Sequence, residues 1–439
     1  MVGPASGHAP ETRTEPRDFG DGELPRVGWV DRRIHGWTWQ AFPIGMGTGA
    51  VYVLLSGMHY HWPVLTRVET GFYILNLFLF VVNTTMLALQ AFLYPKQSLR
   101  LLRDPMRGIF VPLIGLSFAT IIIGTINYTV PAEPKLVYAL FWIYTALAVM
   151  ICFPMLMIWF SQPHELVKFT PGFAFLIFPM VFPSLFLIGY HPTHLFTKML
   201  VGVVAFNALR VIEASDPRSI GILLTGYFFQ GLGSFMTFIY IGIYVLRIMT
   251  TGFLEGHQAN GAFVACGPPG FTALALIKLG SHSREILTVH NLVSPAAGEI
   301  WYAWSVLMGL MLFGVAVFLF LFGALPYWFK IRKDLNEILG CWALTFPNVG
   351  WIATLEVLGD IFHIRGLYIV YYVMTALICL VWCILIVLTA LAFWKGLIFR
   401  SPPEDVIQDV SLSPRPAVAR EKRRARDSGS SSGSQASAV

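Results

Sequence analysis

Ten apolar runs of membrane-spanning length constrain this chain more than any other feature of its sequence. A helix needs about 20 consecutive apolar residues to cross the hydrocarbon core of a bilayer. Backbone groups in lipid must be hydrogen-bonded internally, and the short alternating segments of a β-barrel are absent from the sequence. The sequence therefore predicts an all-α membrane protein with ten transmembrane helices. The runs cover about 37–58, 70–94, 108–130, 136–160, 171–212, 218–248, 261–280, 299–328, 336–358 and 366–397.

Composition and charge exclude several other classes of protein. The 439 residues are 56% hydrophobic and 12% charged, more apolar than a soluble domain of this length needs to be. The net charge of +6 is concentrated in the tails and a few loops, where it concerns membrane topology rather than nucleic acid. All five cysteines lie in apolar runs without metal-ligand spacing. Because the sequence also has no catalytic pairing and no nucleotide-binding loop, it predicts no enzyme, no metal, no cofactor and no nucleic-acid partner.

Basic residues determine the predicted orientation in the membrane. Four segments are rich in lysine and arginine: both tails, the loop after the second run and the loop after the eighth. An even number of spans puts all four on one side, which the positive-inside rule makes cytoplasmic. We therefore expect a multi-pass plasma-membrane protein with cytoplasmic N- and C-termini. Its parts are a disordered tail over 1–35, a ten-helix domain over 36–399 and a disordered, basic, Ser/Gly-rich tail over 400–439.

Prolines with glycine nearby interrupt every odd-numbered run, whereas most even-numbered runs lack them. Proline removes a backbone donor and clashes with the preceding helical turn, so such positions predict helix breaks. Their spacing of 69, 67, 89 and 79 residues indicates five tandem helix hairpins, each with one broken helix. The marker prolines are Pro43, Pro112, Pro179, Pro268 and Pro347.

One interval between these prolines is longer than the others because of residues 181–198. Without them the interval would be 71 residues, and the fifth run would be one ordinary helix. Two interpretations stay open: a genuine loop or re-entrant element, and an in-frame product of gene prediction such as a retained short intron. A transcript that lacks these codons would support the second interpretation.

Broken helices at membrane depth are tolerated where the freed backbone is buried in protein or lines a wet cavity. Five of them at matching places predict a central pore formed by the odd-numbered helices. Uncharged polar side chains near the breaks could line a path for anions, although each one could equally form a helix–helix hydrogen bond. The bulky ring of Phe346, beside Pro347, could plug the axis. The predicted path residues are Gln40, Thr48, Ser117, Thr120, Thr272, Thr345 and Asn348.

Ionisable side chains within or beside the runs are further candidates for function. Glu356 precedes Asp360 by four residues and shares its helical face, as an interfacial carboxylate or as a proton relay. Lys278 closes the seventh run and either attracts anions or extends to the interface. Three histidines of the outer loops are either surface residues or sensors of external pH: His59, His61 and His363.

At these residues the chain resembles the tellurite-resistance/dicarboxylate transporter family. This family groups bacterial tellurite-resistance channels, plant guard-cell slow anion channels, fungal malic acid transport proteins and fungal sulfite efflux pumps. The resemblance covers about residues 35–400 and depends on five segments in order. They are WTWQAFPIGMGTGAV, SFATIIIGTINYTVP, FFQGLG, CGPPGFTALALI and CWALTFPNVGW.

The resemblance implies a pore surrounded by five helix hairpins, a homotrimer, a small anionic substrate and occlusion of the pore by Phe346. CGPPGFTALALI and FPNVGW are most similar to the fungal C4-dicarboxylate (malate) transporters, whereas MGTG and LSFATII are also similar to sulfite efflux pumps. The malate branch implies an Arg-Pro pair where this chain has Ala259 and Asn260. We expect transport of small organic anions such as malate through a Phe-gated pore, with sulfite efflux as the alternative and a membrane-embedded enzyme or receptor as the third hypothesis.

Overall fold

The computed structural model describes residues 27–104, 108–129, 132–160, 199–255, 257–330 and 337–412. These residues form helices and contain no β-strand. Seven helical segments are long and apolar enough to cross a membrane, and Leu113–Tyr128 and Leu200–Leu209 are shorter apolar helices. The expectation of an all-α membrane protein is confirmed for this part of the chain. The number of ten spans remains a prediction.

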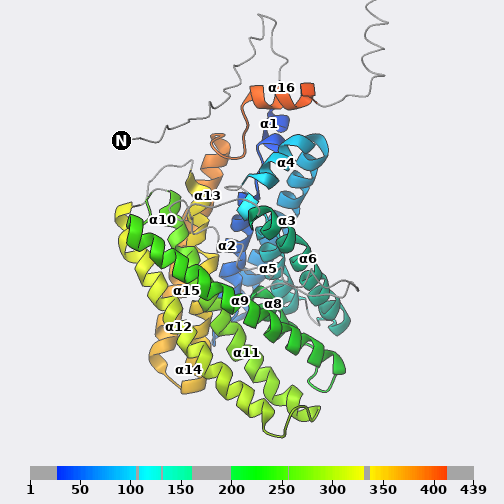
Figure 1. Ribbon diagram of the computed structural model, residues 1–439, viewed down its shortest axis with the longest axis vertical. Coiled ribbons are helices and arrows are strands. Elements are labelled where there is room, and N and C mark those ends of the chain that lie inside the picture. Colours follow the sequence, from blue (N-terminus) through cyan, green and yellow to red (C-terminus); the bar gives the residue numbers. More distant parts are fainter. Residues whose placement is uncertain are drawn as a thin grey trace, which may run out of the picture. The chain divides into compact units, whose positions relative to one another are not determined.

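The helices labelled in Figure 1 differ in how deeply their side chains are buried. Five are buried along most of their length: α2 (Phe42–Leu55), α5 (Leu113–Tyr128), α8 (Met199–Leu209), α11 (Gly267–Val289) and α14 (Phe346–Phe362). The longer helices that follow them expose many large apolar side chains, as lipid-facing helices do. These are α3 (Pro63–Leu93), α6 (Pro134–Phe160), α9 (Pro217–Thr251), α12 (Ala297–Lys330) and α15 (Arg365–Trp394).

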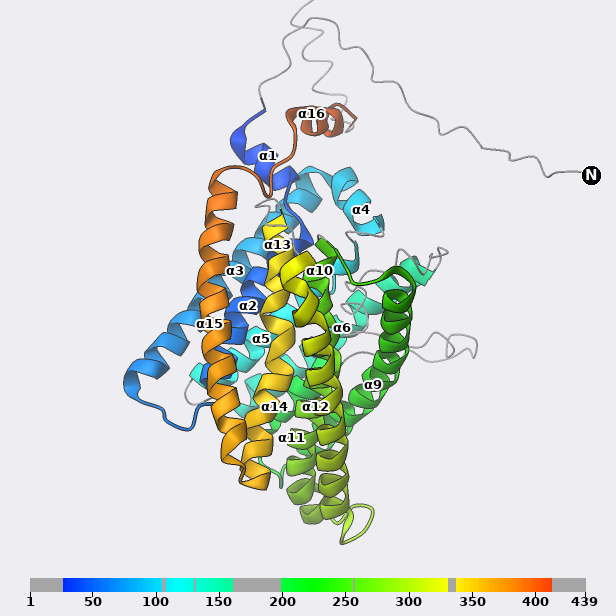
Figure 2. The same cartoon turned by 90° about the vertical axis from the view of Figure 1, so that its left-hand side faces the viewer.

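The buried helices contact one another and their longer neighbours. Helix α11 packs against α8, α9, α12 and α14, and α2 packs against α3, α5, α14 and α15. Figure 2 shows α14 and α15 running side by side. Short helices complete the described segments: α1 (Trp29–His35), α4 (Pro95–Arg103), α10 (His257–Gly261), α13 (Ile338–Cys341) and α16 (Pro403–Leu412).

Each described break has the same form, a short 3-10 helix followed by an α-helix that begins at or beside the marker proline. The 3-10 segments are η1 (Trp39–Ala41), η2 (Gly108–Phe110), η6 (Ala262–Cys266) and η8 (Trp342–Leu344). Pro43, Pro268 and Pro347 lie in the first turn of their helices, and Pro112 is the N-cap of α5. Proline is well tolerated in a first turn, where the backbone N–H has no intrahelical partner. The break therefore costs less than an interior proline would.

Two expected positions lie outside the described residues. Pro179 and residues 181–198 belong to the range 161–198, so the fifth break and the origin of the long interval remain predictions. The described part of the fifth run is α8.

Two short helices lie within the segments expected to be tails. Helix α16 lies within the expected tail 400–439, and α1 occupies the end of 1–35. Helix α16 begins at Pro403. The carboxylates of Glu404 and Asp405 in its first turn stabilise it by interacting with the positive end of the helix dipole. By contacts the chain divides into Arg33–Ser401 and a smaller unit of Met1–Arg32 with Pro402–Val439. The site described below lies within the larger unit.

Candidate functional site

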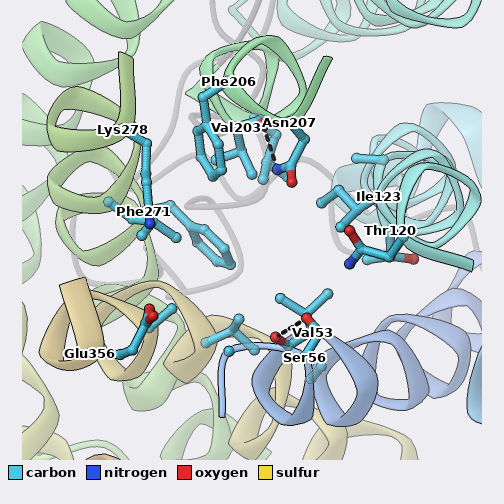
Figure 3. A pocket seen from close by; sticks show the side chains of 18 of the residues that line it. Val53, Ser56, Thr120, Ile123, Val203, Phe206, Asn207, Phe271, Lys278 and Glu356 are labelled. Carbon is cyan, nitrogen blue, oxygen red and sulfur yellow. Dashed lines mark hydrogen bonds between the residues drawn. The ribbon is translucent and has the colours of Figure 1, made fainter. Parts of the chain in front are cut away.

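A cavity of about 420 Å³ lies among all five buried helices. Its walls include Ala50 of α2, Thr120 of α5, Val203 of α8, Phe271 of α11 and Glu356 of α14. Thr120 and Ile123 lie on one flank and Lys278 and Glu356 on the other (Figure 3). The four helices that begin at or beside the described marker prolines therefore surround one common space together with α8.

The cavity contains more cationic than anionic groups among its described residues. Arg210 and Lys278 line it together with a single carboxylate, Glu356. The Arg210 guanidinium donates to the Asn127 side-chain oxygen at 2.9 Å and to that of Asn207 at 3.3 Å. Two fixed cations against one carboxylate leave a net positive charge, which favours the entry of anions.

Phe346 lies between this cavity and a second, smaller one. Its side chain is 5% exposed and lines both spaces. The smaller cavity, of about 60 Å³, is lined by residues near the helix starts, among them Gln40, Pro43 and Pro347. The Phe346 ring stacks on the Phe271 ring with centroids 5.0 Å apart. Phe346 therefore separates the two cavities, and the ring stacked on it belongs to the wall of the larger one.

The backbone at Phe346 is shaped by its neighbours. Thr345 has φ −97° and ψ −85°, outside the helical region, and Pro347 then starts the regular turns of α14. Gly270 of α11 lets the two helices approach closely, because a Cβ there would lie 2.7 Å from the Trp351 backbone nitrogen. Small residues allow such helix crossings in membranes. This crossing holds the two phenylalanines in contact.

Most of the predicted path residues form local hydrogen bonds instead of lining the larger cavity. Thr48, Thr272 and Thr345 are buried and donate to Ile44, Pro268 and Trp342 carbonyls, respectively, at 2.7–2.9 Å. Asn348 donates to the Leu344 carbonyl and accepts from the Trp351 indole. Ser117 is fully buried. Thr120 lines the larger cavity, and Gln40 lines the smaller one.

The Thr120 hydroxyl is part of a buried network between α2, α3 and α5. The Asn76 amide donates to the Thr120 hydroxyl at 2.9 Å and to the Tyr52 hydroxyl at 3.1 Å. Tyr52 in turn donates to the Thr120 carbonyl at 2.5 Å. Bonds of this kind position a cavity wall as well as joining helices.

The ionisable candidates occupy different places. Glu356 lines the cavity, whereas Asp360 accepts from Tyr368 and lies 3.3 Å from the His59 imidazole. His61 lies 3.3 Å from the buried Glu69 carboxylate.

The pair that replaces the expected Arg-Pro is buried near the smaller cavity. Ala259 and Asn260 line neither cavity, and the Asn260 side-chain oxygen accepts from Tyr327 at 2.8 Å. A Cβ at Gly340, which lines the smaller cavity, would lie 3.3 Å from the Asn260 amide nitrogen. Ala259, at the position of the implied arginine, is buried and offers no cation there.

Sequence reasoning missed Arg210, Asn127, Asn207 and His282, which all line the larger cavity. Each lies near the end of an apolar run, where a polar residue indicates only the membrane interface. The sequence did contain one usable signal: Lys278 and His282 are four residues apart and therefore share a helical face. Their distance from Arg210 along the chain hid the cluster.

Comparison with known families gives one match over most of the chain. A family model described as voltage-dependent anion channel (SLAC1) matches residues 36–390.

Curated relatives carry two kinds of transport name. A putative malic acid transport protein of Schizosaccharomyces pombe is 25% identical over 394 residues, which cover 87% of this chain and 85% of the relative. A second malic acid transport protein of that organism is 23% identical over 374 residues, 83% of this chain and 80% of the relative. The sulfite efflux pump SSU1 of Arthroderma otae is 24% identical over 315 residues, 70% of this chain and 77% of the relative.

Proposed function

Since the voltage-dependent anion channel model matches most of its length, the chain belongs to that family, and we propose that it moves small organic anions across the plasma membrane. C4-dicarboxylates such as malate are the proposed substrates, with the two termini in the cytoplasm and the chain assembled as a homotrimer. The family and the relatives are channels and transporters, not enzymes.

The position of Phe346 between the two cavities carries this proposal. Anions enter the larger cavity, attracted by Arg210 and Lys278, and the stacked Phe346 and Phe271 rings close the way to the smaller cavity. Movement of the Phe346 ring opens the path. An uncharged hydrophobic constriction of this kind passes an anion without holding it in a deep ion pair.

Sulfite efflux is the second candidate, because a specific residue favours it. Ala259 stands where the resemblance to the malate branch implies an arginine, so the guanidinium expected to hold a second carboxylate is missing from that position. An anion with one compact charged centre needs no second cation there. The relatives named as sulfite efflux pumps support this candidate as well.

One experiment tests the gate and the substrate together. We expect Phe346→Ala to raise basal anion flux into vesicles about tenfold, the change that a barrier lower by about 1.4 kcal/mol gives. Malate and sulfite are measured side by side, and the proposal expects malate to be carried faster.

The matched control is Phe263→Ala, which removes an equally buried ring that lines neither cavity. It should leave basal flux unchanged. A Phe346→Ala protein that elutes as the wild type and conducts no faster would contradict the gate. Faster flux of sulfite than of malate would favour the second candidate.

A further inference from the structure

His282 lines the larger cavity, and the gating mechanism gives it no role. It lies on α11 one turn after Lys278 and is partly buried. Phe206 of α8 lines the same cavity. Histidine is the side chain whose charge ordinarily changes between about pH 5 and pH 8. A titratable group therefore stands among the fixed charges of the proposed anion path.

Fixed charges act on His282 from two sides. Lys278 on its own helix and Arg210 beyond α8 are both close enough for their charges to interact with it. Glu356 on α14 interacts with Lys278 from the facing wall.

Among the described residues, the charged side chains of the other two helices packed against α11 lie outside the cavity, Arg247 of α9 included. Arg218 of α9 contacts Asp216 at 2.6 Å, and Glu299 of α12 contacts Arg284 at 2.8 Å. Neither pair lines the cavity. The net charge of the cavity lining is therefore set by four side chains: Arg210, Lys278, Glu356 and His282, whose charge depends on its protonation.

This net charge is too small to neutralise a doubly charged anion. With His282 neutral, two cations and one carboxylate leave one positive charge, so a bound dianion leaves one negative charge in excess. Unbalanced charge is costly at membrane depth. A proton on the His282 imidazole makes the loaded site neutral.

We propose that His282 takes up one proton when the cavity binds a dianion, so that the anion and the proton enter the site together. The proton comes from water and adds to the free ring nitrogen, and no other bond changes. This inference rests on the proposed function, because it requires an anion in the cavity. By linkage, the anion raises proton affinity by the same factor as the proton raises anion affinity.

The test measures anion binding to the full-length protein in detergent through thermal stabilisation. Fumarate and sulfate serve as probes, because both keep nearly constant charge between about pH 5.5 and pH 7.5. For the wild type we expect the apparent dissociation constant to rise about fivefold or more across this range. His282→Gln should bind weakly at both ends of the range, and His282→Arg should bind tightly at both.

His290→Gln is the matched control. His290 caps the same helix, contacts the Ala214 carbonyl at 2.9 Å and does not line the cavity. This variant should keep the wild-type pH profile.

The outcomes separate this proposal from the proposed function. A wild-type pH profile in a folded His282→Gln protein overturns the role of His282, even where fumarate binds. Binding of sulfate alone, with a profile that depends on His282, supports the proton site and contradicts organic-anion transport. Stabilisation by neither probe overturns both.

Discussion

Glu356 is the one carboxylate on the wall of the larger cavity, among the described residues. Its place in the sequence is consistent with an interfacial group or a proton relay. Its position in the cavity, within the electrostatic reach of Lys278, adds a third role. As a counter-charge it weakens the attraction of Lys278 for anions. We therefore expect Glu356 to set how strongly the cavity binds an anion.

We expect Glu356→Gln to lower the apparent KM for fumarate flux about fivefold, the factor that about 1 kcal/mol of removed repulsion gives. Flux into vesicles at equal pH on both sides measures it, and the pH dependence should persist because His282 remains. The control is Glu285→Gln, which removes an exposed carboxylate of α11 that does not line the cavity.

Two other results would change the assignment. A KM for Glu356→Gln equal to that of the wild type would exclude the counter-charge role. Loss of both acid-driven uptake and pH dependence would assign the proton site to Glu356 rather than to His282.

At the scale of the helices, the crossing of α11 and α14 depends on two glycines. A methyl group at Gly350 would overlap the Phe271 backbone nitrogen, and one at Gly270 would overlap the Trp351 backbone. These positions lie on helix backbones, which cannot move aside as a flexible side chain can. The stacked Phe346 and Phe271 rings follow from this close approach.

Gly350→Ala should destabilise the protein by about 1–3 kcal/mol, the usual cost of overpacking. A thermal melt in detergent measures it as a lower midpoint, and disturbed ring stacking should raise basal anion flux. Gly314→Ala on α12 is the control, since no atom lies within 4 Å of its added methyl group. There the higher helix propensity of alanine should leave stability equal or slightly greater. A Gly350→Ala protein as stable as this control would contradict the packing argument.

At the scale of the larger unit, Arg33–Ser401, hydrogen bonds join residues near its two ends; we call these contacts the clasp. The buried Arg33 guanidinium donates to the Phe393 and Ile398 carbonyls at 2.6 Å each, and it lies 4.1 Å from the centre of the Phe393 ring. His35 bonds the Ser401 hydroxyl at 2.8 Å. Cations favour the carbonyl end of a helix, so Arg33 stabilises the end of α15.

Arg33→Met keeps an unbranched apolar stem and removes the charged hydrogen bonds, which contribute about 1.5–3 kcal/mol each. We expect a lower melting midpoint and faster proteolysis near residues 393–401, measured by limited digestion and mass spectrometry. Arg365→Met, at an exposed position, should change neither readout. Equal digestion of both variants would exclude the clasp as a stabilising contact.

Much of this architecture was predictable because lipid leaves a chain few choices. The length of the apolar runs predicted helices, because backbone groups in lipid must be hydrogen-bonded within the chain. The positions of Pro43, Pro112, Pro268 and Pro347 located the described breaks. The matching family model confirms the resemblance to the family. What the sequence could not provide was the direction in which side chains point. The hydroxyls of Thr48, Thr272 and Thr345 donate to nearby backbone carbonyls. The sequence near a break is the same whether such a hydroxyl faces a cavity or a carbonyl.

The sequence alone thus determined a helical membrane protein with proline-marked helix starts, since these depend on local hydrogen bonding and on the lack of water in the bilayer. Only the tertiary structure decided which residues share the cavity. Arg210, Lys278, His282 and Glu356 come from three separate segments of the chain, and Phe346 lines both cavities. Such a cluster results from helix packing over long sequence separations, which neither hydropathy nor spacing along the chain records.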